Sequence, residues 1–295
     1  MGQRRAVLIA GPTASGKSAL ALERARTGGG VIVNTDAMQV YDGLRVLTAR
    51  PGPEELAAAE HRLYGFVSPL VRFSTGAWAA AAQKVIQETE VDGRELIFVG
   101  GTGLYFEALT NGFAPVPEIP DAALAEAEAD IAGLDGPQRL ALLAERDPEM
   151  ARRLQAPDPQ RVTRALAVLK ATGRSLATFQ DEAQQGLLDG FAVEKLVLNP
   201  DREVLRQRIA RRFETMLGEG AIAEVQALLA LDPDPRLPAM KAIGVPEIAA
   251  MLAGEMTRET AVERAVIATR QYAKRQRTWF RNRMGDWTWI DPLAR

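Results

Sequence analysis

Cysteine is absent from the 295-residue sequence, and histidine occurs once. Without cysteine the chain can form neither disulfides nor thiolate metal sites, which is typical of proteins in a reducing cytosol. We interpret the one histidine, His61, as a structural residue. No apolar run approaches the roughly 18 residues of a membrane helix. Because 47% of the residues are nevertheless hydrophobic, we expect a cytoplasmic protein with a core of its own.

The sequence also lacks a large excess of either charge, because its 36 lysines and arginines nearly balance its 38 aspartates and glutamates. The charges are unevenly distributed along the chain, however. Residues 118–149 contain nine acidic and two basic residues, whereas residues 257–284 contain eight basic and two acidic residues. This asymmetry predicts one basic face that binds a polyanion.

Short apolar segments alternate with helical segments in the first third of the sequence and again near residue 200. We expect buried strands at residues 5–11, 31–33 and 95–101, and a further strand at residues 194–200. This alternation predicts an α/β fold with a parallel sheet flanked by helices, and the stretch GPTASGKS after the first strand makes the expected fold similar to P-loop NTPases. In such a sheet, functional residues gather at the carboxyl ends of the strands.

A proline-rich stretch marks a boundary within this pattern, since residues 115–120 contain three prolines. The sequence from about residue 121 to 190 is rich in Ala, Glu, Arg and Leu, and shows helical periodicity without a clear strand. We therefore predict a catalytic core that is interrupted by an all-helical insertion. The core comprises residues 1–114 and 192–295, and the insertion comprises residues 115–191.

A phosphate-binding loop follows the first predicted strand. The stretch GPTASGKS fits the pattern G-x-x-x-x-G-K-[ST], with a strand before it and a helix after it. In such a loop, backbone N–H groups surround an anion, Lys17 reaches the outer phosphate oxygens and Ser18 can bind Mg²⁺. The pattern does not identify the molecule that carries the phosphates. The predicted loop residues are Gly11, Pro12, Thr13, Ala14, Ser15, Gly16, Lys17 and Ser18.

Two further strand ends carry polar residues. Asp36 follows the second predicted strand, on the same edge as the P-loop, where a carboxylate suits a general base. The alternative is a capping or turn aspartate. Thr102 lies in a glycine-flanked turn after the third strand, where glycines permit close approach by a ligand. The alternative there is a tight connection between a strand and a helix.

Basic residues recur at helical spacing in three places. Arg270, Lys274, Arg277 and Arg281 form one stripe of the last predicted helix, with no acidic residue on it. We interpret this stripe as a contact for nucleic-acid phosphates, and a solvated helix face is the alternative. The same alternative holds for the two other groups. These are Gln160, Arg161 and Arg164 in one segment, and Arg208, Arg211 and Arg212 in another.

Taken in order, these motifs resemble the bacterial tRNA dimethylallyltransferases over nearly the whole chain. The P-loop alone is not specific, whereas DAMQVY after the second strand, with GGTGLY downstream, is highly specific. Further matching segments are QRVTRALAVL, RRFETML, KAIGVPE and TRQYAKRQRTWFRN.

The resemblance implies an activity and its substrates. The P-loop is then expected to hold the diphosphate of dimethylallyl diphosphate, with Mg²⁺, rather than a triphosphate. The acceptor is the exocyclic N6 of the adenosine 3′-adjacent to the anticodon of a tRNA, which must leave its stack to react. The expected enzyme is a monomer. The alternatives are a P-loop small-molecule kinase and a non-catalytic P-loop RNA-binding protein.

The resemblance also assigns roles to residues. Asp36 is the base, Lys17 acts on the diphosphate, Thr102 helps place the tRNA, and Arg212 assists the diphosphate with Arg208 as the alternative. Three positions depart from relatives, and these are Leu124, Val245 and Pro246; contacts of these residues with tRNA are therefore in doubt. The expected tRNA-contacting stretches are Asp36, Ala37, Met38 and Gln39, and Gln160, Arg161, Val162, Thr163 and Arg164.

Overall fold

The structure is a computed structural model that describes residues 4–114, 116–154, 156–182 and 184–292. The chain divides into two compact units. The core unit comprises residues 1–110 and 187–295, and the helical unit comprises residues 111–186. The sequence placed these boundaries four or five residues later in the chain, and Pro115, its first insertion residue, lies outside the described residues.

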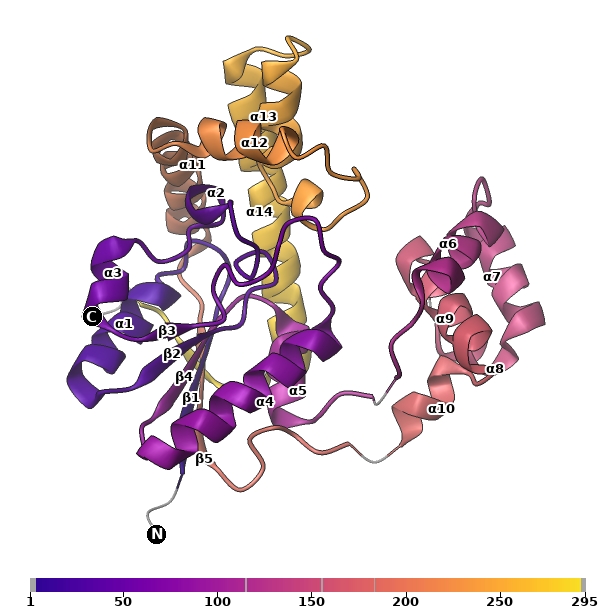
Figure 1. Cartoon of the computed structure of the whole chain (residues 1–295), viewed down its shortest axis with the longest axis horizontal. Coiled ribbons are helices and arrows are strands. Elements are labelled where there is room, and N and C mark those ends of the chain that lie inside the picture. The colour runs from indigo at the N-terminus through magenta and orange to yellow at the C-terminus, as the bar shows by residue number, and fades with distance from the viewer. Residues whose placement is uncertain (1–3, 115, 155, 183, 293–295) are drawn as a thin grey trace. The chain divides into compact units, whose positions relative to one another are not determined.

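A parallel sheet forms the centre of the core unit (Figure 1). The strand order is β3-β2-β4-β1-β5-β6, so β1 lies between β4 and β5, and every described pair is parallel. The predicted α/β fold with a parallel sheet is therefore confirmed. The strands are β1 (Arg5–Ala10), β2 (Val31–Asn34), β3 (His61–Arg62), β4 (Leu96–Gly100), β5 (Ala192–Leu198) and β6 (Thr288–Ile290).

The sequence analysis missed the two edge strands, β3 and β6. They contain only two and three residues, too few for a period-2 pattern to stand out. His61 lies in β3, where its Nδ1 is 2.9 Å from the carbonyl oxygen of Ala59 and its ring contacts Tyr64 edge to face. These contacts agree with a structural role for His61.

Helices cover both faces of the sheet, because alternate strand residues point to opposite sides. Leu8 in β1 belongs to the core cluster on one face, whereas Val7 and Ile9 belong to the cluster on the other face. Figure 1 shows α1 and α3 on one side of the sheet and α4, α5 and α14 on the other. The helices of the core unit are α1 (Lys17–Gly28), α2 (Arg45–Thr48), α3 (Pro53–Ala58), α4 (Thr75–Asp92), α5 (Gly103–Thr110), α11 (Arg202–Gly218), α12 (Ala221–Leu229), the 3₁₀ helix η1 (Ala239–Lys241), α13 (Val245–Leu252) and α14 (Arg258–Arg283).

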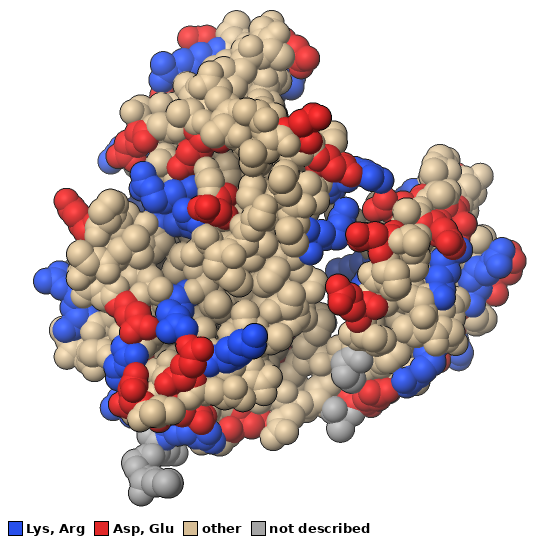
Figure 2. All heavy atoms as spheres, viewed as in Figure 1, with Lys and Arg blue, Asp and Glu red and all other residues tan. Residues whose placement is uncertain are grey.

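The helical unit has a hydrophobic core of its own, formed by Leu143, Val162, Leu166 and their neighbours. Asp135, Asp147 and Asp158 each cap the helix that follows them, as expected for aspartate at an N-cap. Acidic side chains gather over α6 (Figure 2). The five helices of the unit are α6 (Asp121–Asp130), α7 (Gly136–Arg146), α8 (Pro148–Arg153), α9 (Pro159–Thr172) and α10 (Leu176–Asp181).

None of the described helices combines the length and the apolar content needed to cross a bilayer.

Candidate active site

The P-loop connects β1 to α1 and exposes the beginning of that helix. Ala14 and Gly16 have positive φ angles of 63° and 93°, and the N–H of Ser15 donates to the carbonyl oxygen of Pro12 at 3.2 Å. No side chain caps α1, and its first turn contains no acidic residue. The partial positive charge of the helix N-terminus is therefore available to an anion.

Three arginines of α11 face this loop. Arg208, Arg211 and Arg212 line a cavity of about 490 Å³ together with residues 14–19 of the P-loop and α1. None of the three forms an ion pair with a carboxylate in the described part of the chain. Unpaired guanidinium groups beside a P-loop favour a bound polyphosphate. The structure thus brings Arg212, and its alternative Arg208, to the predicted site.

Lys17 is the first residue of α1 and also lines this cavity. Burial lowers the pKa of its ammonium from 10.5 to about 8, while the negative charge of Asp36 raises that pKa and the positive charge of Arg212 lowers it further. Burial likewise lowers the pKa of Arg212, and Asp36 raises it. Lys17, Arg212 and Asp36 therefore lie close enough to interact electrostatically.

Asp36 follows β2, in a turn that occupies only one of its carboxylate oxygens. Its Oδ1 accepts the N–H of Met38 at 2.9 Å, and its own N–H donates to the side-chain oxygen of the buried Asn34 at 2.8 Å. Asp36 therefore has the turn role that the sequence left as an alternative. This role uses Oδ1 and does not exclude a role for Oδ2 as a base.

Thr102 joins this turn to the neighbouring strand β4. Its hydroxyl oxygen accepts the N–H of Ala37 at 2.9 Å, and its own N–H donates to the carbonyl oxygen of Thr35 at 3.0 Å. Because β2, β4 and β1 are adjacent in the sheet, their carboxyl ends bring together Asp36, Thr102 and the P-loop. The sequence predicted this grouping from the positions of the strand ends.

The sequence analysis missed Gln276, which lies on α14 and is 5% exposed. Its Oε1 accepts the N–H of Thr13 at 3.0 Å, and its Nε2 donates to the carbonyl oxygen of Gly101 at 3.0 Å. The only available signal was its spacing from the buried Ala273 and Phe280, which places all three on one helix face.

The negative charge of Asp36 acts on three tyrosines. Burial, and next the negative charge of Asp36, raise the pKa of Tyr64, Tyr105 and Tyr272 well above 10. For Tyr272, the positive charge of Arg275 opposes part of this increase in pKa. All three hydroxyls therefore stay protonated at neutral pH.

The predicted basic stripe of α14 lies in a groove shared with α11. The four stripe residues line a cavity of about 610 Å³, and α11 adds Arg202 and Arg206, which the sequence analysis did not include. Of these six cations, only Arg206 pairs with a described carboxylate, that of Glu203. The Nε atom of Arg277 is buried and has no described partner. The stripe residues are Arg270, Lys274, Arg277 and Arg281.

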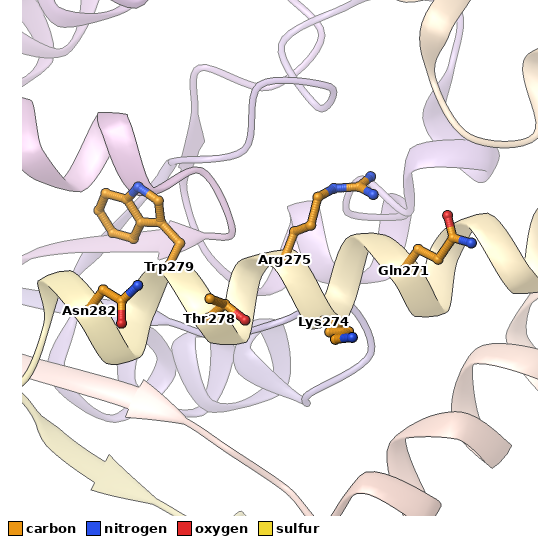
Figure 3. Close-up of a pocket in the computed structure, with 6 residues that line it drawn as sticks. All are labelled: Gln271, Lys274, Arg275, Thr278, Trp279 and Asn282. Carbon is orange, nitrogen blue, oxygen red and sulfur yellow. The ribbon is translucent and has the colours of Figure 1, made fainter. Parts of the chain in front are cut away.

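Another side of α14 carries two further residues that the sequence analysis missed. Figure 3 shows Arg275 and Trp279 projecting from the same side of the helix, away from Lys274. Both line a shallow cavity of about 450 Å³. The ring of Trp279 lies so close to Gly103 that a Cβ there would be 2.4 Å from it. An aromatic ring beside the Thr102 turn suits stacking against a base.

The remaining predicted tRNA contacts lie on other elements. Gln160, Arg161 and Arg164 are exposed on α9 of the helical unit. Val162 and Thr163 are 0% and 8% exposed, because they occupy the buried face of the same helix. Their side chains therefore pack inside the unit rather than face solvent, which the sequence analysis did not anticipate.

The three departures from relatives also differ in exposure. Leu124 packs partly buried in the core of the helical unit. Val245 is buried in the core unit, whereas Pro246 next to it is exposed.

A metal at this site would depend on few protein ligands. Among the described residues, no three His, Asp or Glu side chains gather as a metal cluster. Mg²⁺ bound to phosphates needs no such cluster, because phosphates and water supply most of its ligands. The hydroxyl of Ser18, exposed in the first turn of α1, is an oxygen ligand of the required kind.

Comparisons with known proteins agree on one family. The family described as IPP transferase matches residues 39–283. A tRNA dimethylallyltransferase of Chelativorans sp. (strain BNC1) is 54% identical over 283 residues, which covers 96% of this chain and 97% of the relative. Another, of Methylobacterium sp. (strain 4-46), is 53% identical over 291 residues, with 98% and 95% covered.

Solved structures give the same result. A tRNA isopentenylpyrophosphate transferase of Bacillus halodurans superposes with a TM-score of 0.69 at 32% identity, covering 98% of this chain and 90% of that one. A eukaryotic dimethylallyltransferase acting on tRNA gives a TM-score of 0.81 at 26% identity, covering 98% and 74%. The chain therefore belongs to the IPP transferase family, as its motifs predicted.

Proposed function

We propose that this enzyme transfers a dimethylallyl group from dimethylallyl diphosphate to N6 of the adenosine 3′-adjacent to the anticodon in tRNA. C1 of the dimethylallyl group forms a bond to N6, its bond to oxygen breaks, and diphosphate leaves. The N6 proton passes to the base. The names of the relatives agree with this reaction, and they favour it over the kinase alternative.

The observation that carries the proposal is the arrangement of charges at the strand ends. The P-loop and three unpaired arginines face one cavity, and a carboxylate lies within electrostatic reach of Lys17. Cations on the leaving diphosphate stabilise the negative charge that develops as the C–O bond breaks. Lys17 and Arg212 are assigned to this task, with Arg208 beside them.

Mg²⁺ is part of the proposal. Mg²⁺ would neutralise negative charge on the diphosphate oxygens, and the hydroxyl of Ser18 would hold the metal. The protein would contribute this one hydroxyl, while the diphosphate contributes most of the other ligands.

Asp36 is assigned as the base that accepts the N6 proton. Its Oδ1 is held by the N–H of Met38, which fixes the carboxylate plane and leaves Oδ2 for the substrate. Thr102 is assigned to holding this turn and placing the adenosine. An adenine amino group is a weak nucleophile, so a positioned base contributes strongly to its attack.

The tRNA is assigned to basic and aromatic residues outside this centre. The stripe of α14 and Arg202 of α11 would bind backbone phosphates, because they are cations without acidic partners among the described residues. Residues 36–39 and the exposed Gln160, Arg161 and Arg164 are further proposed contacts. The enzyme is proposed to act as a monomer in the cytoplasm, and size-exclusion chromatography with light scattering checks the oligomeric state.

A diphosphate-release assay tests the proposal. Release that requires both dimethylallyl diphosphate and a tRNA anticodon stem-loop supports it, as does a gain of one dimethylallyl mass on the RNA. A kinase would instead convert ATP to ADP with a small-molecule acceptor. An RNA-binding protein without activity would bind the stem-loop and release nothing. Either of the last two results would reject the proposal.

A further inference from the structure

Gln276 of α14 joins two loops that are far apart in the sequence. It is separated from Thr13 by 263 residues and from Gly101 by 175 residues, and its side chain is bonded to both. One loop is the P-loop after β1, and the other is the turn after β4 that continues into Thr102. A single buried amide therefore links the two parts of the site that the proposed reaction assigns to different substrates.

The chemistry of the link requires an amide of this length. Its oxygen accepts the N–H of Thr13, and its nitrogen donates to the carbonyl oxygen of Gly101. A carboxylate of the same shape could accept but not donate, and a thioether could do neither. Asparagine is one methylene shorter and cannot span both partners.

Gly101 is shaped to receive this amide. A Cβ at Gly101 would lie 2.1 Å from Nε2 of Gln276, so the amide fills the space that any side chain would need. The same position is 3.5 Å from Oδ2 of Asp36. The amide therefore contacts the Gly101 turn on the side that faces the carboxylate oxygen left open by the Met38 turn.

We propose that Gln276 is a positioning residue that fixes the distance between the diphosphate cradle and the Asp36–Thr102 turn. The bond to Thr13 orients the Pro12–Thr13 peptide of the P-loop, so that the following N–H groups point at the diphosphate. The bond to Gly101 holds the turn that carries the base. This inference rests on the proposed function, because transfer needs C1 and N6 to be aligned.

The test uses Gln276→Ala and Gly101→Ala, singly and together. Gln276→Ala removes both bonds, and Gly101→Ala displaces the amide from the opposite side. Each single variant should lower kcat at saturating tRNA and dimethylallyl diphosphate by about 10- to 100-fold, because misplacement of reacting groups by about 1 Å has that cost. The double variant should be no slower than Gln276→Ala, since both changes break the same contact.

Binding of inorganic diphosphate, measured by calorimetry without tRNA, separates this inference from the proposed reaction. Gln276→Ala should raise the dissociation constant by roughly 3- to 10-fold, the effect of losing one hydrogen bond that orients the loop. This readout does not need catalysis. It therefore still tests the Thr13 half of the link if the wild-type enzyme fails to modify tRNA, a failure that would reject the proposed function.

Thr89→Val is the matched control for loss of a buried hydrogen bond. Thr89 is 2% exposed on α4 and donates to the carbonyl oxygen of Val85 at 2.8 Å. This variant should lower the melting temperature and leave kcat and diphosphate affinity unchanged. The inference is overturned if Gln276→Ala, like Thr89→Val, lowers only the melting temperature and leaves kcat and diphosphate affinity unchanged. It is also overturned if the effects of Gln276→Ala and Gly101→Ala on kcat add in the double variant.

Discussion

The hydroxyl oxygen of Thr102 accepts the backbone N–H of Ala37 at 2.9 Å, and so ties the end of β4 to the turn of Asp36. Threonine at this position is therefore more than a small residue in a strand-to-helix connection. It determines where the backbone next to the proposed base lies. Several variants of the two loops separate this role from direct contact with tRNA.

Thr102→Val keeps the shape of the side chain and removes the acceptor. The N–H of Ala37 then loses its partner, and the Asp36 turn loosens. We expect kcat to fall by about 10-fold, the worth of one hydrogen bond in a partly buried site. Thr102→Ser keeps the hydroxyl and should retain most of the activity. Steady-state kinetics give kcat for both variants. Equal kcat values would reject the proposed role of the hydrogen bond between Thr102 and Ala37.

Asp36→Asn keeps the size of the side chain and an acceptor for the N–H of Met38, but removes the base. Binding of tRNA should survive, while the single-turnover rate falls by about 10²- to 10⁴-fold. The loss should appear in kcat at saturating tRNA, because the proton moves in the transition state.

Melting temperature is the companion measurement for Asp36→Asn. If Asp36 only holds its turn, the free energy of unfolding should fall by about 0.5–2 kcal/mol with little change in rate. A folded variant that binds tRNA and turns over at a near-normal rate would remove Asp36 from the chemistry.

The pKa of Lys17 predicts how diphosphate binding depends on pH. Burial lowers this pKa to about 8, so in the ligand-free enzyme the ammonium loses its proton as the pH rises through that value. The dissociation constant for inorganic diphosphate should therefore rise above about pH 8, by at most about tenfold per pH unit. Lys17→Arg stays charged and should remove this dependence. Calorimetry of both proteins at the same pH values cancels the titration of diphosphate itself.

The same pKa has a consequence for stability. Its folded value lies below the ordinary 10.5, so the unfolded chain binds more protons at this residue between about pH 8 and 10.5, and the wild-type fold gains stability as the pH rises through that window. Lys17→Met should thus melt higher than wild type at pH 7, and the difference should shrink toward pH 10.5. A difference that is constant with pH would contradict the shift.

The groove between α11 and α14 predicts the salt dependence of tRNA binding. Reversing the charges of Lys274 and Arg277 should weaken binding and reduce the slope of log K against log salt by about 1–2, since each lost phosphate contact contributes about 0.9 or less. Affinity for dimethylallyl diphosphate alone should not change. Binding is measured by fluorescence anisotropy at several salt concentrations.

The control for the groove reverses Arg26 and Arg264, which are exposed on α1 and α14 and line none of the cavities described above. The overall charge then changes equally. If this control reduces the salt slope as much as the groove variant does, the effect comes from net charge, and the groove is only a solvated surface.

Much of the site followed from the sequence because its residues sit at strand ends. A strand that ends in glycines or a polar turn is a local pattern, and parallel strands place such ends at one edge. Asp36 and Thr102 were predicted in this way, whereas Lys17 was predicted from the GPTASGKS motif after the first strand. The stripe of α14 was found because cations at helical spacing also form a local pattern.

The parts that the sequence did not predict depend on contacts between distant segments. Gln276 is an ordinary polar residue in a basic helix until the P-loop and the Gly101 turn supply its two partners. The burial of Val162 and Thr163 was overlooked because a contiguous stretch was treated as one contact, although a helix turns successive residues to different sides. Arg202 and Arg206 of α11 were overlooked because they join the basic groove only through the packing of α11 beside α14.

The bond between Thr13 and Gln276 can form only late during synthesis of the chain. A ribosome makes the P-loop well before α14, with 263 residues between the two partners. The nascent chain can pair β1 with β4 before α14 is made, but its P-loop lacks the bond to Gln276 until α14 has emerged. A product of translation that stops before α14 would thus lack Gln276, and its diphosphate cradle would remain unfinished.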